Sequence, residues 1–349
     1  MKSLSAEYLD SILFNTEQMG NLRIIGEYRG KQALFIKQSP ETLNTLRMVA
    51  KIESSESSNR LEGIELPHKK IEELVLKETV PTNRSEQEIA GYRDALNLIH
   101  ESGEHMPFTI GIILQLHGIL CRYLSNPGGR WKATDNEIIE TNPDGTKRIR
   151  FIPTKAHLTQ TVMEQLTKNY SDAVIQQQRD PLILVPLAIL DFLCVHPFSD
   201  GNGRMSRLLT LMLLYHFDYK VGHYISLERI FEDSKESYYE TLEASSKNWH
   251  EGKHDVKPWL NYFWGVLIRA YREFEDRVGV IITSRGSKTE LIRSTINRKI
   301  NPFSISDIES DCPGISRDMI RLVLRQMKDE GLIIPKSKGR SALWQKIIK

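Results

Sequence analysis

The sequence predicts a mainly α-helical protein that contains a β-hairpin and ends in a small separate module. Two apolar runs, at residues 182–195 and 208–215, are each long enough for a buried helix, and a polar stretch lies between them. The clearest strand patterns lie within residues 136–153 and near the C-terminal end. With 349 residues, of which 40% are hydrophobic, the chain is long enough for two or three domains with sizeable cores.

The N-terminal region contains two kinds of predicted element. Residues 22–25 and 33–36 are expected to form short strands around a turn. A helix is expected from residue 40 to residue 61, because its apolar residues recur at helical spacing on one face. Gly63 is placed to end this helix, since glycine readily adopts the left-handed conformation found at helix ends.

Further helices are expected on both sides of the hairpin. The apolar spacing predicts them at residues 85–102, 109–124 and 159–177, and another at 258–277. The hairpin itself is predicted because two apolar segments flank Asn-Pro-Asp-Gly at 142–145, which is a strong turn signal.

The polar stretch at residues 196–207 reads His-Pro-Phe-Ser-Asp-Gly-Asn-Gly-Arg-Met-Ser-Arg. Its Asp-Gly-Asn-Gly segment cannot comfortably continue a helix, so it presents successive backbone N–H groups at the start of the next one. Those donors and the helix dipole favour an anion, most often phosphate. Arg204 and Arg207 lie one turn apart on the same face and would add forked donors for phosphate oxygens.

His196 and Asp200 complete the chemistry expected of a nucleotide-phosphate site. A carboxylate beside bound phosphates most simply holds Mg²⁺, which favours one or two carboxylates together with phosphate oxygens. Histidine has an ordinary pKa near neutrality, which suits a general base. Each feature alone is common in structural turns and helix ends, but their occurrence in one segment indicates a functional site.

This stretch resembles the Fic motif, His-Pro-Phe-x-Asp-Gly-Asn-Gly-Arg-x-x-Arg, at every fixed position. Fic proteins mostly move AMP from ATP to a hydroxyl side chain of a target protein. The resemblance implies that His196 is the base, that Asp200 holds Mg²⁺, and that Arg207 holds the γ-phosphate of ATP. The implied ATP- and phosphate-binding residues of the motif are Asp200, Gly201, Asn202, Gly203, Arg204, Met205, Ser206 and Arg207.

A second segment resembles the inhibitory motif of the family, Ser/Thr-x-x-x-Glu-Gly/Asn, through Ser58, Glu62 and Gly63. In the family this glutamate pairs with the second arginine of the Fic motif and displaces the γ-phosphate. Glu62 and a γ-phosphate would compete for Arg207, because both are anions that seek the same forked donor. The position of the segment resembles the class with an N-terminal inhibitory helix. In some members the same glutamate aligns a water that removes AMP, so a reverse activity stays open.

The hairpin and a pair of tyrosines have positions that match two further parts of the family site. The family's flap covers the site and binds the target backbone by strand addition, which here points to Ile149, Arg150 and Phe151. A hairpin without such a role is the alternative. Tyr238 and Tyr239 match tyrosines that line the adenine pocket, whereas paired tyrosines on a helix are more commonly the edge of a core.

From about residue 281 the composition becomes basic. Residues 281–349 hold 14 lysines and arginines against 7 acidic residues, a balance of +7 that leaves −5 for the rest of a chain whose total is +2. The pattern resembles a winged helix, with helices near 289–299, from 304 and at 316–330, then strands at 332–335 and 342–347.

The last helix of this module carries Arg317, Arg321, Arg325 and Lys328 on one face. In a DNA reader such a helix enters the major groove. The alternative is a protein-docking or dimerising module whose basic face is merely solvated.

The expected domains are residues 1–110 with the inhibitory helix at about 40–63, a Fic domain at 111–278, and a winged-helix-like domain at 281–349. A net charge of +2 gives no overall signal for a polyanion, and the three cysteines are too far apart to suggest disulfides or a zinc site. The sequence shows neither a signal-peptide core nor an apolar run of membrane-spanning length, so a cytoplasmic protein without membrane contact is expected.

The sequence therefore predicts a Mg²⁺-dependent protein adenylyltransferase that uses ATP and is restrained by Glu62. Its acceptor would be a Tyr, Thr or Ser hydroxyl of a target protein or of the chain itself, and a homodimer and other nucleotides stay open. The alternative function is a DNA-binding regulator whose Fic-like domain senses a nucleotide. His196 favours the enzyme, because a sensor would not need a base.

Overall fold

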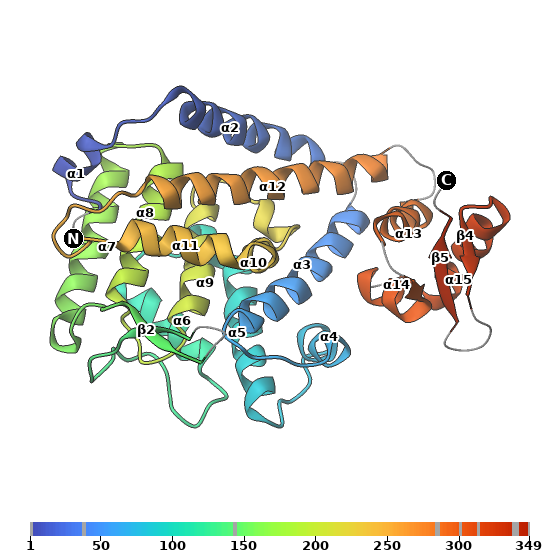
Figure 1. The fold of residues 1–349 in the computed structure, drawn as a ribbon, viewed down its shortest axis with the longest axis horizontal. Helices are drawn as coiled ribbons and strands as arrows, with labels where there is room; N and C mark the ends of the chain where they lie inside the picture. Colours follow the sequence, from blue (N-terminus) through green and yellow to red (C-terminus); the bar gives the residue numbers. More distant parts are fainter. Residues whose placement is uncertain are drawn as a thin grey trace.

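The computed structural model describes residues 3–36, 40–141, 145–282, 287–299, 302–312, 315–336 and 342–347. The protein is mainly helical, as the sequence predicts (Figure 1). The helices that precede the C-terminal module are α1 (Ala6–Ser11), α2 (Thr16–Ile36), α3 (Pro40–Arg60), α4 (His68–Leu76), α5 (Arg84–Ser102), α6 (Ile110–Leu120), α7 (Thr159–Ile175), α8 (Pro181–Val195), α9 (Asn202–Tyr215), α10 (Leu227–Asp233), α11 (Lys235–Ser246) and α12 (Lys257–Ile282), with short 3₁₀ turns η1 (Gly103–His105), η2 (Ala156–Leu158) and η3 (Val221–His223).

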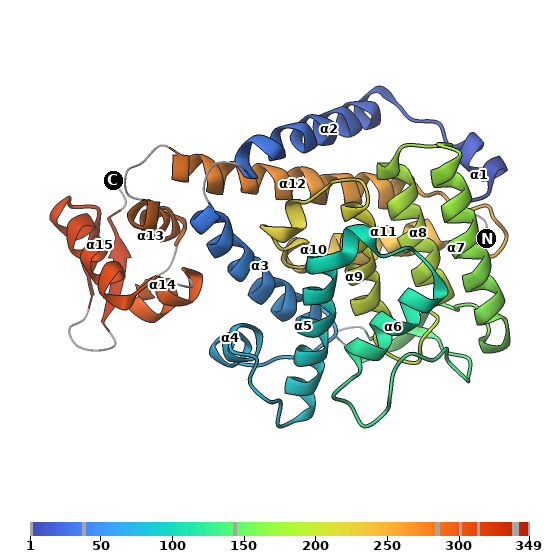
Figure 2. The same cartoon turned by 180° about the vertical axis from the view of Figure 1, so that it is seen from behind.

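Helices α8 and α9 form the centre of the bundle, and nearly all of their residues are buried. This burial follows from sequences that are apolar around most of the helix rather than on one stripe. Helices α7, α11 and α12 pack against α8, and α5 and α6 pack against α9, with α5 and α6 in front when the molecule is seen from behind (Figure 2). The polar stretch of the sequence is thus the loop between the two most buried helices.

The expected strands at 22–25 and 33–36 are wrong, because both segments belong to the single helix α2. Helix α2 lies along α12 in both views (Figures 1 and 2). Ile25 is fully buried and the Tyr28 ring stacks on Tyr271 at 5.4 Å between centroids. Burial of this face against α12 outweighs the weak local preference of the segment for helix.

The predicted hairpin is present as β1 (Ile138–Thr141) and β2 (Lys147–Phe151), paired antiparallel with a bulge between Ile138 and Ile139. Residues 142–144 of the predicted turn lie outside the described residues. The first residue after them, Gly145, has φ +82°, which is the left-handed conformation that the turn signal requires.

The C-terminal module contains α13 (Ser287–Arg298), β3 (Phe303–Ser304), α14 (Ile305–Asp311), α15 (Arg317–Asp329), β4 (Ile333–Pro335) and β5 (Leu343–Lys346). Its strands form one antiparallel sheet in the order β3-β5-β4, and it has a hydrophobic core of its own. This order of elements is the one expected of a winged helix, with β3 as an addition. Residues 337–341, between β4 and β5, lie outside the described residues.

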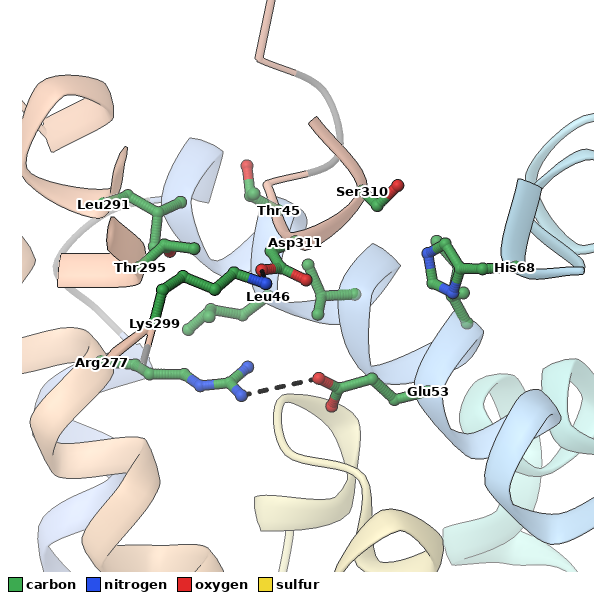
Figure 3. Close-up of a pocket in the computed structure, with 12 residues that line it drawn as sticks. Thr45, Leu46, Glu53, His68, Arg277, Leu291, Thr295, Lys299, Ser310 and Asp311 are labelled. Atoms are coloured by element: carbon green, nitrogen blue, oxygen red, sulfur yellow. Dashed lines mark ion pairs between the residues drawn. The ribbon is translucent and has the colours of Figure 1, made fainter. Parts of the chain in front are cut away.

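A cavity of about 300 Å³ is lined by residues of this module, of α3 and of α12 (Figure 3). Among the residues that line the cavity, Glu53 of α3 and Arg277 of α12 form an ion pair of 3.7 Å, and Lys299 and Asp311 of the module form an ion pair of 2.6 Å.

Within the described part of the chain, none of the helices has the length and apolar character needed to cross a membrane.

Helix α8 has a proline at its centre, and α12 compensates for it. Pro186 has no N–H, so the carbonyl of Leu182 lacks its normal helical donor. The indole Nε1 of Trp264 donates to that carbonyl at 2.8 Å, and Trp259 donates to the Pro186 carbonyl at 2.8 Å. Both indoles are almost fully buried, so α12 supplies hydrogen bonds as well as apolar contact to the central helix.

We predict that Trp264→Phe destabilises the protein by about 2–4 kcal/mol, because it removes both buried volume and the donor to Leu182. Pro186→Ala restores a backbone N–H that can donate to the same carbonyl. It should therefore recover about 1 kcal/mol more in the Trp264→Phe background than in the wild type. Urea unfolding of the four proteins measures this coupling, and equal effects of Pro186→Ala in both backgrounds would contradict the explanation.

Candidate active site

The loop between α8 and α9 is held by residues from three directions. His196 caps α8 in a left-handed conformation with φ 49°, and Gly201 begins α9 with φ 80°. The side chain of Asn202 accepts from the N–H of Phe198 at 2.9 Å and donates to its carbonyl at 2.8 Å. The Phe198 ring is fully buried and stacks on His117 at 3.6 Å. The polar loop is therefore rigidly attached to the core.

His117 fixes the centre of the same loop. Its Nδ1 accepts from the N–H of Gly129 at 2.9 Å, which leaves Nε2 as the donor to the carbonyl of Asp200 at 3.1 Å. Burial lowers the pKa of His117 to about 4, so the ring is neutral near pH 7 and this tautomer is maintained. Sequence reasoning missed His117, because a histidine within an apolar helix is more commonly a core residue.

The first turn of α9 faces the end of α3, where the sequence placed the inhibitory motif. Arg207 is almost completely buried and donates to the Glu62 carboxylate at 2.7 Å. Its guanidinium also donates to the Ser58 hydroxyl at 2.8 Å and to the Ser58 carbonyl at 2.8 Å. The predicted contact between Glu62 and Arg207 is thus present, and Ser58 contributes to it directly.

Two glycines allow Glu62 to reach this position. Gly63 has φ +79° and closes the turn that ends α3, as the sequence predicts. A Cβ at Gly203 would lie only 2.1 Å from Oε1 of Glu62, so the missing side chain leaves room for the carboxylate. The carboxylate lies against the N-terminal turn of α9, which is the place where the sequence predicts an anion.

Arg204 points toward the interior rather than toward Glu62. It forms an ion pair of 2.7 Å with Glu88 of α5, and both side chains are buried. Its other contacts are weaker, at 3.5 Å to the side chain of Asn59 and 3.6 Å to Asp200. Sequence reasoning missed Glu88, because a glutamate on a polar helix is common and its partner is far away in the sequence.

His196 has the protonation state that a general base needs. The imidazole is mostly buried, and burial together with the nearby Lys132 ammonium lowers its pKa to about 4. A hydrogen bond to the Leu193 backbone, Glu62 and Asp200 act in the opposite direction and raise the pKa. At pH 7 the ring is therefore neutral and can accept a proton.

A cavity of about 540 Å³ lies beside His196 and brings most of the predicted residues together. Its lining includes the predicted residues Glu62, Arg150, Phe151, His196, Gly203, Arg207, Tyr238 and Tyr239. The remaining predicted residues are absent from the lining. Of these, Met205 is packed in the core, the Ser206 hydroxyl donates to the Gly203 carbonyl, Ile149 is half exposed, and Asp200 has a side chain that is 64% exposed.

The flap is fastened to α11 on one side of this cavity. Arg148 donates to both carboxylate oxygens of Glu243 at 2.7 and 2.8 Å. The guanidinium of Arg150 lies over the Tyr239 ring at 5.1 Å and donates to the carbonyl of the same residue. The Tyr239 hydroxyl in turn donates to the carbonyl of Leu61 at 3.3 Å. Flap, tyrosine pair and inhibitory segment are thus in direct contact.

The arrangement fits a phosphate-bearing ligand and a divalent cation. The N-terminal turn of α9 and Arg207 offer donors, and the Asp200 carboxylate beside them is accessible. One carboxylate next to phosphate oxygens is a donor set that Mg²⁺ accepts. The tyrosine pair and the flap offer aromatic and planar surfaces at the other end of the cavity.

Comparison with known proteins identifies the family that the central part of the chain resembles. The model of the Fic/DOC family matches residues 107–214, which include the flap, the loop at 196–207 and most of α9. A solved structure of a Fic family protein from Desulfovibrio desulfuricans G20 is similar over 97% of this chain and 98% of its own, with a TM-score of 0.62 and 20% identity.

Two other solved structures share the fold. A Fic domain containing signaling protein from Bacteroides thetaiotaomicron VPI-5482 is similar over 71% of this chain and 94% of its own, with a TM-score of 0.61 and 21% identity. A part of Fic-1 from C. elegans is similar over 75% of this chain and 72% of its own, with a TM-score of 0.56 and 19% identity. The family match and the common fold together lead to one conclusion: this chain carries a Fic/DOC family domain.

Proposed function

We propose that the protein is an autoinhibited protein adenylyltransferase that moves AMP from ATP to a hydroxyl group of a protein. Fic domains generally transfer AMP or other nucleotide-derived groups to proteins. The single observation that carries the proposal of an autoinhibited AMP transferase is the position of Glu62. Its carboxylate occupies the α9 N-terminus and pairs with Arg207, where the terminal phosphate of a nucleoside triphosphate would otherwise bind.

In the proposed reaction His196 takes the proton from the acceptor hydroxyl, whose oxygen attacks the α-phosphorus of ATP. The new P–O bond forms as the bond from that phosphorus to the bridging oxygen of the β-phosphate breaks, and pyrophosphate leaves. The N–H groups of the α9 N-terminus stabilise the charge that develops on the phosphate oxygens. Mg²⁺, when bound, neutralises phosphate charge, and Asp200 is the residue that would hold it.

The rest of the cavity supports a purine nucleotide and a polypeptide acceptor. Tyr238 and Tyr239 lie beside the cavity and would pack against the adenine ring. The flap is a two-stranded sheet, so a strand edge is available to which an extended target segment can add. We propose a hydroxyl-bearing protein as the partner, and self-modification, a homodimer and reverse removal of AMP belong to the same proposal.

The alternative function as a DNA-binding regulator has less support from the C-terminal module. Two of its four basic α15 residues are paired with carboxylates, Arg317 with Glu309 at 3.2 Å and Arg321 with Asp318 at 2.9 Å. Leu322 on the same helix is half exposed. A mixed apolar and charge-paired face suits protein contact better than a DNA backbone, which calls for unpaired cations.

We predict that Glu62→Gly raises AMP transfer by about 10- to 100-fold. The variant frees Arg207 from a charge-assisted hydrogen bond of about 1.5–3 kcal/mol, and each 1.4 kcal/mol corresponds to a factor of ten. Incubation with Mg²⁺ and α-labelled ATP measures label on protein. Glu65→Gly, which changes an exposed glutamate three residues away, is the matched control and should behave as the wild type.

A double variant separates release of inhibition from catalysis. Glu62→Gly with His196→Ala should bind ATP as tightly as Glu62→Gly and yet transfer no label, because it lacks the base. Label that persists in the double variant would exclude His196 as the base, and equal labelling by wild type and Glu62→Gly would exclude restraint by Glu62.

The metal assignment gives a separate prediction. In the Glu62→Gly background, Asp200→Asn should raise the Mg²⁺ concentration needed for half-maximal activity by about tenfold or more, because a neutral amide is a weaker ligand for a hard cation. The measurement is the rate of label transfer as Mg²⁺ is titrated after removal of metal with a chelator. An unchanged Mg²⁺ requirement would show that Asp200 is not a ligand.

A further inference from the structure

The backbone of His196 has a conformation that a residue with a side chain adopts reluctantly. Its φ of 49° and ψ of 61° lie in the left-handed region, where the Cβ crowds the following carbonyl. Such a conformation persists only when the surroundings hold it, and it is often found at functional sites. The N–H of His196 completes α8 by donating to the Phe192 carbonyl at 2.9 Å, but this bond does not fix the residues that follow.

One residue binds the carbonyls on both sides of His196. The backbone N–H of Lys132 donates to the Pro197 carbonyl at 2.9 Å, and its ammonium donates to the Val195 carbonyl at 3.2 Å. The ammonium also donates to the side chain of Asn136 at 2.7 Å, and Asn136 donates to the Phe198 carbonyl at 3.2 Å. The segment from Lys132 to Asn136 therefore binds the carbonyl before His196 and the two carbonyls that follow it.

The location of Lys132 is unusual for a lysine. The residue is only 5% exposed, although a buried ammonium is unfavourable unless it is compensated. Both of its observed side-chain acceptors are neutral, and no ion pair to it occurs within the described ranges. Burial lowers the pKa of Lys132 to about 8, so the group is still mainly charged at pH 7. The Asp135 carboxylate opposes this shift but is not in an ion pair with Lys132, so a weakly compensated charge near His196 calls for a functional explanation.

We propose that Lys132 is a positioning residue for His196: it holds the backbone of His196 in the left-handed conformation by binding the carbonyls on either side of it, and it places a positive charge near the imidazole. The catalytic consequence of this proposal rests on the proposed function, whereas its effects on conformation and protonation do not.

The electrostatic part of the proposal follows from the charges around the imidazole. A neighbouring cation disfavours the imidazolium, and Lys132 is the largest influence on the pKa of His196 after burial, whereas Glu62 and Asp200 oppose it. The other charged groups that line the same cavity are Glu140 and Arg150 of the flap, Arg207 of α9, and Lys235 and Glu243 of α11. Removal of the Lys132 charge should therefore raise the pKa of His196 from about 4 toward its ordinary value.

The direct test measures the protonation of His196 in the full chain without any reaction. Histidine-labelled protein is titrated by NMR, and the His196 signal is assigned by its loss in His196→Ala. Lys132→Met should raise the pKa of His196 by about one unit. Lys132→Gln, which retains a donor but no charge, should do the same, and Lys132→Arg should leave the pKa near its original value. An unchanged pKa in Lys132→Met and Lys132→Gln would overturn the electrostatic part of the proposal.

The kinetic test uses the Glu62→Gly background. Lys132→Met should lower kcat at pH 6 by about tenfold, because His196 is then less well positioned to accept the proton; a rise of one unit in its pKa alone would still leave about nine tenths of the imidazole neutral at this pH. The KM for ATP should stay within about twofold, and the acid limb of the pH profile should move to higher pH. Lys155→Met, at an exposed lysine near the flap, is the matched control. A fall in thermal stability without any change in kcat or in the acid limb would reduce Lys132 to a structural role.

The two tests fail independently. If Glu62→Gly transfers no AMP, the proposed function fails, and the NMR titration still decides whether Lys132 controls His196. If Glu62→Gly is active and neither kcat nor the pKa of His196 responds to Lys132, the proposed function stands and the positioning role falls.

Discussion

The contact between Arg207 and the end of α3 is the interaction on which the arrangement of this protein depends. A guanidinium that is almost completely buried is stable only where acceptors surround it, and Ser58 and Glu62 supply them. Polar side chains nearer the start of α3 also have buried partners, since the Ser54 hydroxyl donates to the buried Glu228 carboxylate at 2.8 Å. A helix with a polar sequence is thus buried because its neighbours offer matching partners, and Arg207 is one of them.

Most of the fold and the motif at 196–207 could be predicted from the sequence because their determinants are local. Apolar periodicity revealed the helices, and contiguous residues carried the motif. The N-terminal strands were wrong because the helical state of α2 depends on α12, which lies more than 200 residues later in the sequence. Lys132 and Glu88 escaped prediction for the same reason, since their partners are 63 and 116 residues away. The roles of the site residues and the domain boundaries stay predictions.

Rigidity is distributed unevenly around the site. The loop with His196 is held by Asn202, His117 and Lys132 through buried hydrogen bonds. The flap, in contrast, is attached to α11 partly through the exposed ion pair of Arg148 with Glu243, which contributes little and weakens with salt, and partly through Arg150, which contacts Tyr239. The groups that would perform the chemistry are therefore fixed, while part of the attachment of the element that would receive a target depends on salt.

Helix α3 has one further consequence for the molecule as a whole. Its 21 residues form a rod about 32 Å long. Its first half forms a wall of the cavity beside the C-terminal module, and the turn after its last residue carries Glu62. An α-helix is stiff along its axis, so a displacement of one end would also move the other end. Helix α3 therefore connects the cavity beside the module with the contact between Glu62 and Arg207.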